Sequence, residues 1–229
     1  MKTYYDWIEY NSQRNNDAIR IYNYNLKSKV NFIEKGVHKN ARDIYALSLV
    51  LAEKKNLISN ILDFGSNLIP QSNLLNKINI NKYRFYIYST HVQKIKKKFK
   101  FKYKFINKIK NLEKHKFDLI YFGSSLQYIR NLKELGNLKF IGNSKYVLIS
   151  HTPIILNNNK TYRESQTTVK RKIVKNLIQN IHSYRDITKN LLRNRFSLKF
   201  KSINEIQYSG LKKRKKNVYS LNLLFKNKK

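Results

Sequence analysis

The chain has 229 residues and a formal net charge of +35, and its 41% content of hydrophobic residues is too high for a disordered chain. Its length suits one α/β domain with an appendage. It contains no cysteine, which excludes disulfides, a catalytic thiol and cysteine-bound metal and fits a cytoplasmic location. The sequence has no run of 18 apolar residues and no apolar leader, so we expect neither a transmembrane segment nor a signal peptide.

The first predicted elements are helical and precede the first strand of a sheet. Residues 1–37 are polar and rich in tyrosine and asparagine, and they predict an N-terminal helical extension ahead of a domain over residues 38–229. The strongest helix prediction covers residues 40–56, where an asparagine cap precedes an apolar stripe. Residues 61–64 then predict the first strand, and residues 68–78 predict the helix that crosses back over the sheet.

Six further stretches predict strands: residues 83–89, 99–105, 117–122, 145–150, 196–203 and 217–225. In residues 99–105 aromatic residues alternate strictly with lysine, which indicates a half-exposed strand at a sheet edge. Residues 165–194 predict mainly helix, and the last two strands predict a closing hairpin. Strands that alternate with helices predict an α/β fold with a mainly parallel sheet, helices on both faces and right-handed crossovers. The hairpin adds one antiparallel strand.

Three motifs occur in an order that resembles one family. They are ILDFG (61–65), FDLIYFGSSLQYIRN (117–131) and VLISHTPI (147–154). This set is similar to S-adenosylmethionine-dependent methyltransferases that are often found in bacterial surface-polysaccharide loci. The resemblance runs from about residue 41 to residue 225. It implies a Rossmann-like methyltransferase fold with seven strands and S-adenosylmethionine as cofactor.

The turn after the first strand is the expected start of the cofactor site. Asp63, Phe64 and Gly65 match the family pattern, whereas Ser66 and Asn67 stand where the family has glycine. Glycines in such a turn let the backbone approach the ligand closely. Asparagine can adopt the left-handed backbone conformation, so the turn geometry can survive the replacement.

Other site residues follow from the rule that ligands of an open parallel sheet bind beyond the carboxyl ends of its strands. On this basis the further cofactor-binding candidates are Ser89, His91, Ser124 and Ser125. The resemblance places the substrate pocket at Gln127, Tyr128 and Thr152. Methyltransferases of this fold usually end the second strand with an acid that binds the ribose, and here that strand ends in Ser89 with no acid.

His151 is the candidate acid or base, because it follows a strand at the productive end and titrates near neutral pH. The family more often has a basic residue there, which suggests charge stabilisation instead of proton transfer. No pair of histidines has the spacing of metal ligands with carboxylates nearby, so we expect no metal. A nucleophile elbow and a phosphate-binding loop of the Gly-Lys-Ser/Thr kind are also missing from the sequence.

Three functions stay open at this stage. The first is methyl transfer to a small-molecule or glycan acceptor. The second is a binding or assembly module that kept the fold and lost the cofactor, which the departures at Ser66, Asn67 and the second strand suggest. The third is nucleic-acid binding, suggested by the net charge. It is disfavoured, because lysine far outnumbers arginine and the overall composition matches A/T-rich codons.

Overall fold

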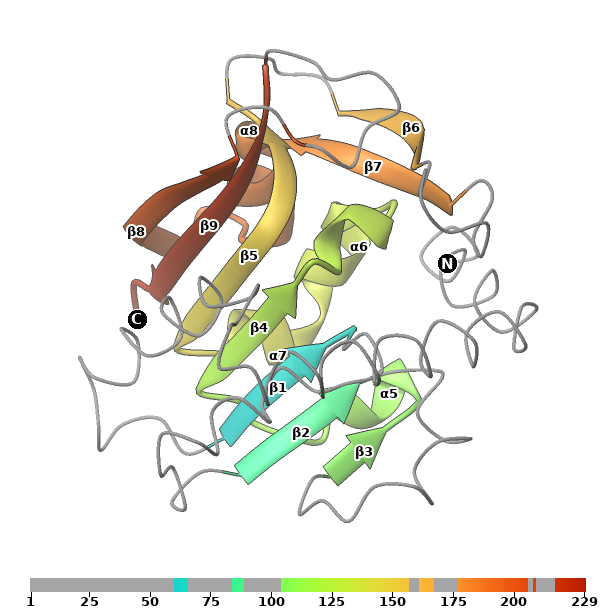
Figure 1. The fold of residues 1–229 in the computed structure, drawn as a ribbon. Coiled ribbons are helices and arrows are strands. Elements are labelled where there is room, and N and C mark those ends of the chain that lie inside the picture. Colours follow the sequence, from blue (N-terminus) through green and yellow to red (C-terminus); the bar gives the residue numbers. More distant parts are fainter. Residues whose placement is uncertain are drawn as a thin grey trace, which may run out of the picture.

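The computed structural model describes residues 60–65, 84–88, 104–156, 161–166, 177–205, 208 and 217–229. The strands in these ranges are β1 (Asn60–Phe64), β2 (Arg84–Tyr88), β3 (Lys104–Ile106), β4 (Leu119–Gly123), β5 (Tyr146–Ile155), β6 (Tyr162–Gln166), β7 (Leu177–Ser183), β8 (Phe196–Glu205) and β9 (Val218–Asn227) (Figure 1). The helical elements are α5 (Ile109–Leu112), the 3-10 helix η5 (Leu126–Tyr128), α6 (Leu132–Asn137), α7 (Lys139–Gly142), α8 (Tyr184–Asp186) and the π-helix η6 (Ile187–Leu191). The predicted extension over residues 1–37 and the predicted helices over residues 40–56 and 68–78 lie outside the described residues.

The sheet is mainly parallel, and its central path runs β3-β2-β1-β4-β5-β9-β8. Its first five strands pair in parallel, and β9 runs antiparallel to both of its neighbours. This confirms the predicted seven-stranded sheet with one antiparallel strand from the C-terminal hairpin. Two further strands, β7 and β6, form an antiparallel ribbon that joins the last two residues of β5. The lysine-bearing β3 lies at one end of the path, as its alternating pattern predicted.

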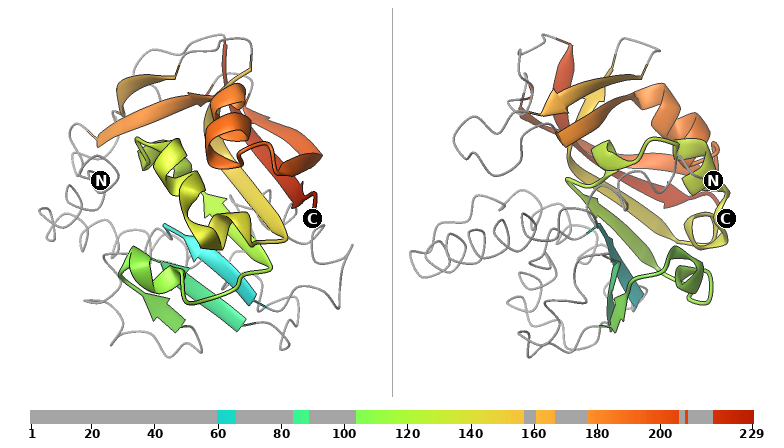
Figure 2. Two further views of the ribbon diagram at one scale, coloured as in Figure 1. Left: turned by 180° about the vertical axis from the view of Figure 1, so that it is seen from behind. Right: turned by 90° about the vertical axis from the view of Figure 1, so that its right-hand side faces the viewer.

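Both faces of the central strands are buried. On one face, apolar side chains from β1, β4 and β5 pack against α5, α6 and α7, and they are Leu62, Phe64, Ile120, Phe122, Val147 and Ile149. Figure 2 shows these helices together on that face. The alternate residues are buried as well, and they include Ile61, Leu119, Tyr121 and Leu148. Near-continuous apolar runs of this kind are typical of parallel strands that are covered on both sides.

The helix predicted over residues 165–194 is wrong at residues 165–166, which end β6, and at residues 177–183, where the chain forms β7. The reason lies in three polar side chains, Asn180, His182 and Ser183, which are all buried. Asn180 donates from Nδ2 to the carbonyl of Gln127 at 3.1 Å, and His182 donates from Nε2 to the carbonyl of Leu126 at 3.2 Å. A periodicity argument treats such residues as solvent-facing and therefore misplaces the segment. The helical part begins only at residue 184.

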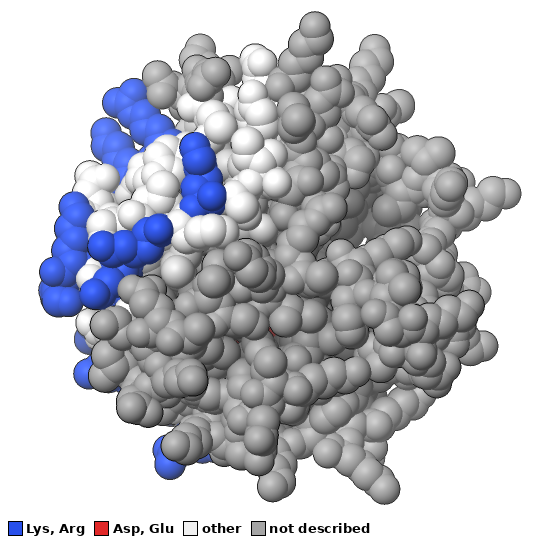
Figure 3. All heavy atoms as spheres, turned by 60° about the vertical axis from the view of Figure 1, so that its left-hand side comes forward, with Lys and Arg blue, Asp and Glu red and all other residues white. Residues whose placement is uncertain are grey.

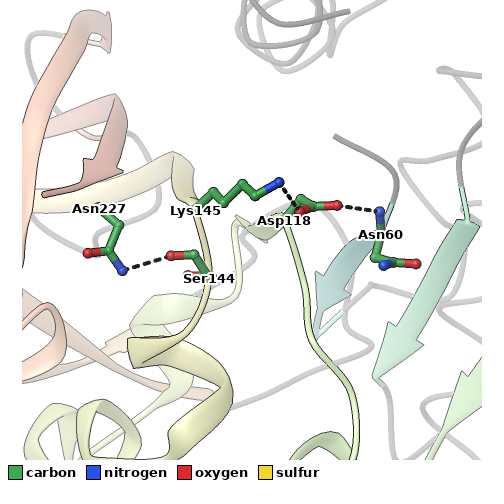
Figure 4. Close-up of polar contacts among 5 residues, drawn as sticks. All are labelled: Asn60, Asp118, Ser144, Lys145 and Asn227. Atoms are coloured by element: carbon green, nitrogen blue, oxygen red, sulfur yellow. Dashed lines mark hydrogen bonds and ion pairs between the residues drawn. The ribbon is translucent and has the colours of Figure 1, made fainter. Parts of the chain in front are cut away.

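Polar contacts fasten the strands at the amino edge of the sheet, where β1, β4 and β5 begin (Figure 4). The Asp118 carboxylate accepts a hydrogen bond from the backbone N–H of Asn60 at 3.0 Å and pairs with Lys145 Nζ at 2.8 Å. The Asn227 side chain donates to the backbone carbonyls of Ser144, at 2.9 Å, and of Gly142, at 3.0 Å. These bonds tie the starts of three parallel strands to the end of β9.

Candidate functional site

The carboxyl ends of β1 and β4 lie beside the middle of β5, because these strands pair in parallel and β5 runs on to Ile155 (Figure 1). The register sets Gly123 of β4 opposite Ser150 of β5. Just beyond, the Ser124 backbone N–H donates to the Ser150 carbonyl at 2.9 Å. This carboxyl edge is where an open parallel sheet binds its ligand.

The turn after β1 requires its glycine. Gly65 has a φ of 77°, a backbone conformation that glycine adopts without steric cost, and its N–H donates to the Tyr88 carbonyl at 2.9 Å. Asp63 is buried, with 3% of its surface exposed. The Phe64 ring packs in the core, with ring centroids 4.7 Å from Tyr88 and 5.0 Å from Phe122. Only the backbone of Phe64 is therefore left to face the carboxyl edge.

Two serines join the strand ends. Ser124 has a φ of 53° and donates from Oγ to the His151 carbonyl at 2.9 Å. Ser125, which is 2% exposed, donates from Oγ to the Phe64 carbonyl at 2.6 Å. The Ser124 bond connects the end of β4 to β5, and the Ser125 bond connects the end of β4 to β1. Each hydroxyl oxygen keeps lone pairs that can accept a further hydrogen bond.

The 3-10 helix η5 carries a buried acceptor. Gln127 is 1% exposed, and its Oε1 has no hydrogen-bond partner among the residues that the structure describes. A buried polar atom without a partner costs about 1–3 kcal/mol, so such atoms are uncommon and often mark a place where a ligand binds. The next residue, Tyr128, is half-buried.

His182 holds η5 in place as a neutral imidazole. Burial lowers its pKa from the ordinary 6.5 to about 4, although the carbonyls of Leu126 and Ile129 and the carboxylate of Asp186 act in the opposite direction. A carbonyl can only accept, so the Nε2 atom that contacts Leu126 carries the proton. The sequence around this histidine does not mark it as buried, so no role could be predicted for it.

His151 lies in a β-bulge with a strained backbone. Its φ is 50°, and the pairing of β5 with β9 shifts register between Ile149 and Thr152. A positive φ costs a residue with a Cβ about 1 kcal/mol or more, so the surrounding contacts must hold it. The His151 N–H donates to Asn222 Oδ1 at 3.0 Å, and its ring Nδ1 lies 3.1 Å from Ser220 Oγ. The imidazole is half-buried.

Ser220 and Asn222 were not among the predicted site residues. Both are buried polar residues on β9. They stand two positions apart within the apolar stretch VYSLNLLF, so they share one face of the strand. That spacing is the signal in the sequence that points to a polar site on this strand. Thr152, predicted for the substrate pocket, is fully buried and uses its hydroxyl to bind the Ser150 carbonyl at 3.1 Å.

The structure thus places the described candidates at or beside the carboxyl edge, and they are Asp63, Phe64, Gly65, Ser124, Ser125, Gln127, Tyr128, His151 and Thr152. Ser66, Asn67, Ser89 and His91 lie outside the described residues. Within the described ranges, no group of three or more His, Asp or Glu side chains is arranged to hold a metal ion. In the same part of the chain, no helix combines the length and apolar character that a membrane span requires.

No family model and no curated protein matches the sequence. Solved structures do match. One is an S-adenosylmethionine-dependent methyltransferase from Methanosarcina mazei, at 11% identity over 78% of this chain and 96% of that chain, with a TM-score of 0.53. Another is the N-terminal domain of EvdMO1 with S-adenosylhomocysteine bound, at 8% identity over 80% of this chain and 81% of that chain, with a TM-score of 0.50. The same domain in the presence of S-adenosylhomocysteine and D-fucose has 9% identity, coverages of 83% and 84%, and a TM-score of 0.50.

Proposed function

We propose that the protein is an S-adenosylmethionine-dependent methyltransferase with its cofactor at the carboxyl edge of the sheet. The chain has the class I methyltransferase fold, and this edge is where that fold would carry a ligand. The observation that carries the proposal is the buried Oε1 of Gln127, which has no hydrogen-bond partner in the described part of the chain. It lies two residues after Ser125, whose hydroxyl bonds the end of β1 next to the Gly65 turn.

The residues present fit the cofactor in chemical type. Gly65 has no side chain, so a ligand can approach the backbone of this turn closely. Asp63 and Gln127 provide oxygen acceptors, which suit the ammonium group of the methionine portion. The hydroxyls of Ser124 and Ser125 add further polar atoms at the same edge. The described part of β2 ends at Tyr88 without an acid, so Ser89 and His91 are our proposed partners for the adenosine portion.

When bound, S-adenosylmethionine supplies an electrophilic methyl group on a sulfonium. The chain must then orient the acceptor and, for a hydroxyl, remove its proton. We assign the removal of that proton to His151. With a proton on Nδ1 that is donated to Ser220 Oγ, the Nε2 lone pair is left to act as the base. The His151 carbonyl accepts a hydrogen bond from Ser124, and the His151 N–H donates one to Asn222. These two bonds hold the backbone of His151 and so fix the position from which its imidazole extends.

We propose a sugar hydroxyl as the acceptor. The support is the sequence resemblance to methyltransferases of surface-polysaccharide loci, together with the EvdMO1 domain whose structure was determined in the presence of D-fucose. A hydroxyl loses a proton during methylation, which agrees with a histidine at the carboxyl edge.

Calorimetric titration with S-adenosylhomocysteine at physiological salt tests the proposal. We expect micromolar binding, and we expect Gln127→Leu to weaken it about tenfold, because a lost hydrogen bond of about 1.4 kcal/mol corresponds to that factor. The same variant should not lower the free energy of unfolding, since the buried oxygen that it removes has no hydrogen-bond partner among the described residues.

Asn60→Leu is the matched control. Asn60 Oδ1 is also buried and has no hydrogen-bond partner within the ranges that the structure describes, but it lies at the amino edge, at the other end of β1. Its backbone N–H, which binds Asp118, is kept in the variant. We expect the control to bind S-adenosylhomocysteine as the parent does. No heat of binding from a protein that shows a cooperative thermal transition would favour the binding-module alternative and overturn the proposal.

A further inference from the structure

A hollow of about 570 Å³ lies at the amino edge of the sheet, away from the proposed cofactor site. Three segments border it: the chain just before β4, the turn between α7 and β5, and the end of β9. Its volume falls in the range of about 300–1,000 Å³ that is typical of small-molecule sites. Neither the fold nor the methyltransferase proposal assigns a role to it.

The lining of the hollow is strongly basic. It includes Lys116, Lys145, Lys226 and Lys229 and, among the described residues, no Asp or Glu side chain. Asp118, which is nearby, pairs with Lys145 at 2.8 Å. Within the described residues, no acidic side chain pairs with the other three lysines. Like charges that are gathered in a concave surface repel one another and raise the local positive potential, which favours an anion in the hollow.

Buried hydrogen bonds shape the floor of the hollow (Figure 4). The Asn227 side chain bonds two carbonyls of the turn between α7 and β5, and its backbone N–H donates to the Lys145 carbonyl at 2.8 Å. The Ser144 hydroxyl, 1% exposed, closes the turn by donating to the Ile141 carbonyl at 2.8 Å. The lysines therefore extend from a backbone that is fixed before any ligand arrives.

Basic side chains also occur on the described surface outside the hollow. Figure 3 shows lysine and arginine gathered along one margin of the described surface, with hardly any acidic side chain in view. Lys199 and Lys201, for example, are exposed on β8, which ends the central sheet path, and they do not line the hollow. Such residues keep a basic protein in solution and provide a comparison for the lysines of the hollow.

We propose that the amino-edge hollow binds a small molecule that carries two adjacent phosphate groups. Lysine binds phosphate as a point charge. One phosphate monoester carries roughly −2 charges near neutral pH. The three lysines that have no acidic partner within the described residues therefore match two adjacent phosphates better than one. A hollow of this volume suits a compact ligand, whereas a nucleic-acid strand needs an extended groove with stacking surfaces. This inference is independent of the proposed methyl transfer.

Calorimetric titration with inorganic pyrophosphate at physiological salt tests this inference. Pyrophosphate has no adenosine portion, so a signal from it cannot arise from the adenosine part of the proposed cofactor site. We expect pyrophosphate to bind at least tenfold more tightly than orthophosphate. The double variant Lys226→Gln/Lys229→Gln should weaken pyrophosphate binding about tenfold or more, because two charge-assisted contacts are lost.

The double variant Lys199→Gln/Lys201→Gln removes the same charge from β8 and is the matched control. We expect it to bind pyrophosphate as the parent does. Equal weakening in both double variants would mean diffuse attraction by net charge and would overturn the inference. It would also be overturned by no binding of pyrophosphate, or by a single-stranded oligonucleotide that displaces pyrophosphate at physiological salt. Thermal unfolding of each variant checks that the chain is folded.

Discussion

Acidification should destabilise the protein through one residue, His182. This buried imidazole donates to the Leu126 carbonyl and so holds η5 beside the carboxyl edge. Its pKa is lowered to about 4 in the folded chain, against 6.5 for an ordinary histidine. The unfolded chain therefore binds a proton at a higher pH than the folded chain does. Stability is complete above about pH 6.5 and falls as the pH drops toward 4.

The size of the effect follows from the two pKa values. At pH 5 an ordinary histidine is almost fully protonated, whereas His182 in the folded chain is still mainly neutral. The difference corresponds to about 2 kcal/mol of unfolding free energy lost between pH 8 and pH 5. Because the chain carries a net charge of +35, other groups also contribute to its acid response. The test therefore rests on a comparison between variants.

Urea unfolding at pH 8 and at pH 5 measures this loss for the parent, His182→Gln and His182→Leu. Glutamine can still donate to the Leu126 carbonyl but does not titrate, so His182→Gln should lose about 2 kcal/mol less than the parent between the two pH values. His182→Leu should show the same reduced pH response and a lower stability at pH 8, because the carbonyl loses its donor. An equal pH response in all three proteins would refute the assignment of this loss to His182.

Three further predictions concern other parts of the fold. Gly136→Ala should lower the free energy of unfolding in urea by about 2 kcal/mol or more, because the added Cβ would meet backbone oxygens of η6. Gly142→Ala should lower it by under about 1 kcal/mol, since its Cβ would meet only the flexible end of an arginine. Equal losses in the two variants would contradict this. Asp118→Ala should cost about 2 kcal/mol in the same assay, because it leaves a backbone N–H and a lysine without their partner; an unchanged stability would contradict it. Ser220→Ala should change the neutral tautomer of His151, read from ¹⁵N chemical shifts at pH 8, since it removes the contact at Nδ1; an identical tautomer in both proteins would rule out the positioning role.

The sequence predicted the sheet well where local pattern and burial agree. β1, β2, β4 and β5 are short apolar runs that are bounded by polar residues, and the parallel pairing of such runs requires few further assumptions. β7 was missed because it is both buried and polar: Asn180 and His182 satisfy backbone carbonyls that lie more than 50 positions away in the chain. A periodicity pattern contains no information about such distant partners.

The candidate site was predictable in part for a similar reason. Parallel topology brings the carboxyl ends of neighbouring strands together, so Gly65, Ser124 and His151 could be placed at one edge from the strand order alone. The partners of His151 on β9 could not be placed. Their contacts depend on the bulge in β5 and on the register of a strand about 70 positions later in the chain.

Hydrogen exchange, followed by mass spectrometry with and without S-adenosylhomocysteine, tests the central claim most directly, because it locates the cofactor as well as detecting it. We predict slower exchange in peptides that cover residues 60–65 and 123–129 at the carboxyl edge. Peptides that cover residues 142–146 and 226–229 at the amino edge should be unchanged. Unchanged exchange throughout the chain, or protection confined to the amino edge, would contradict a cofactor site at the carboxyl ends of β1 and β4.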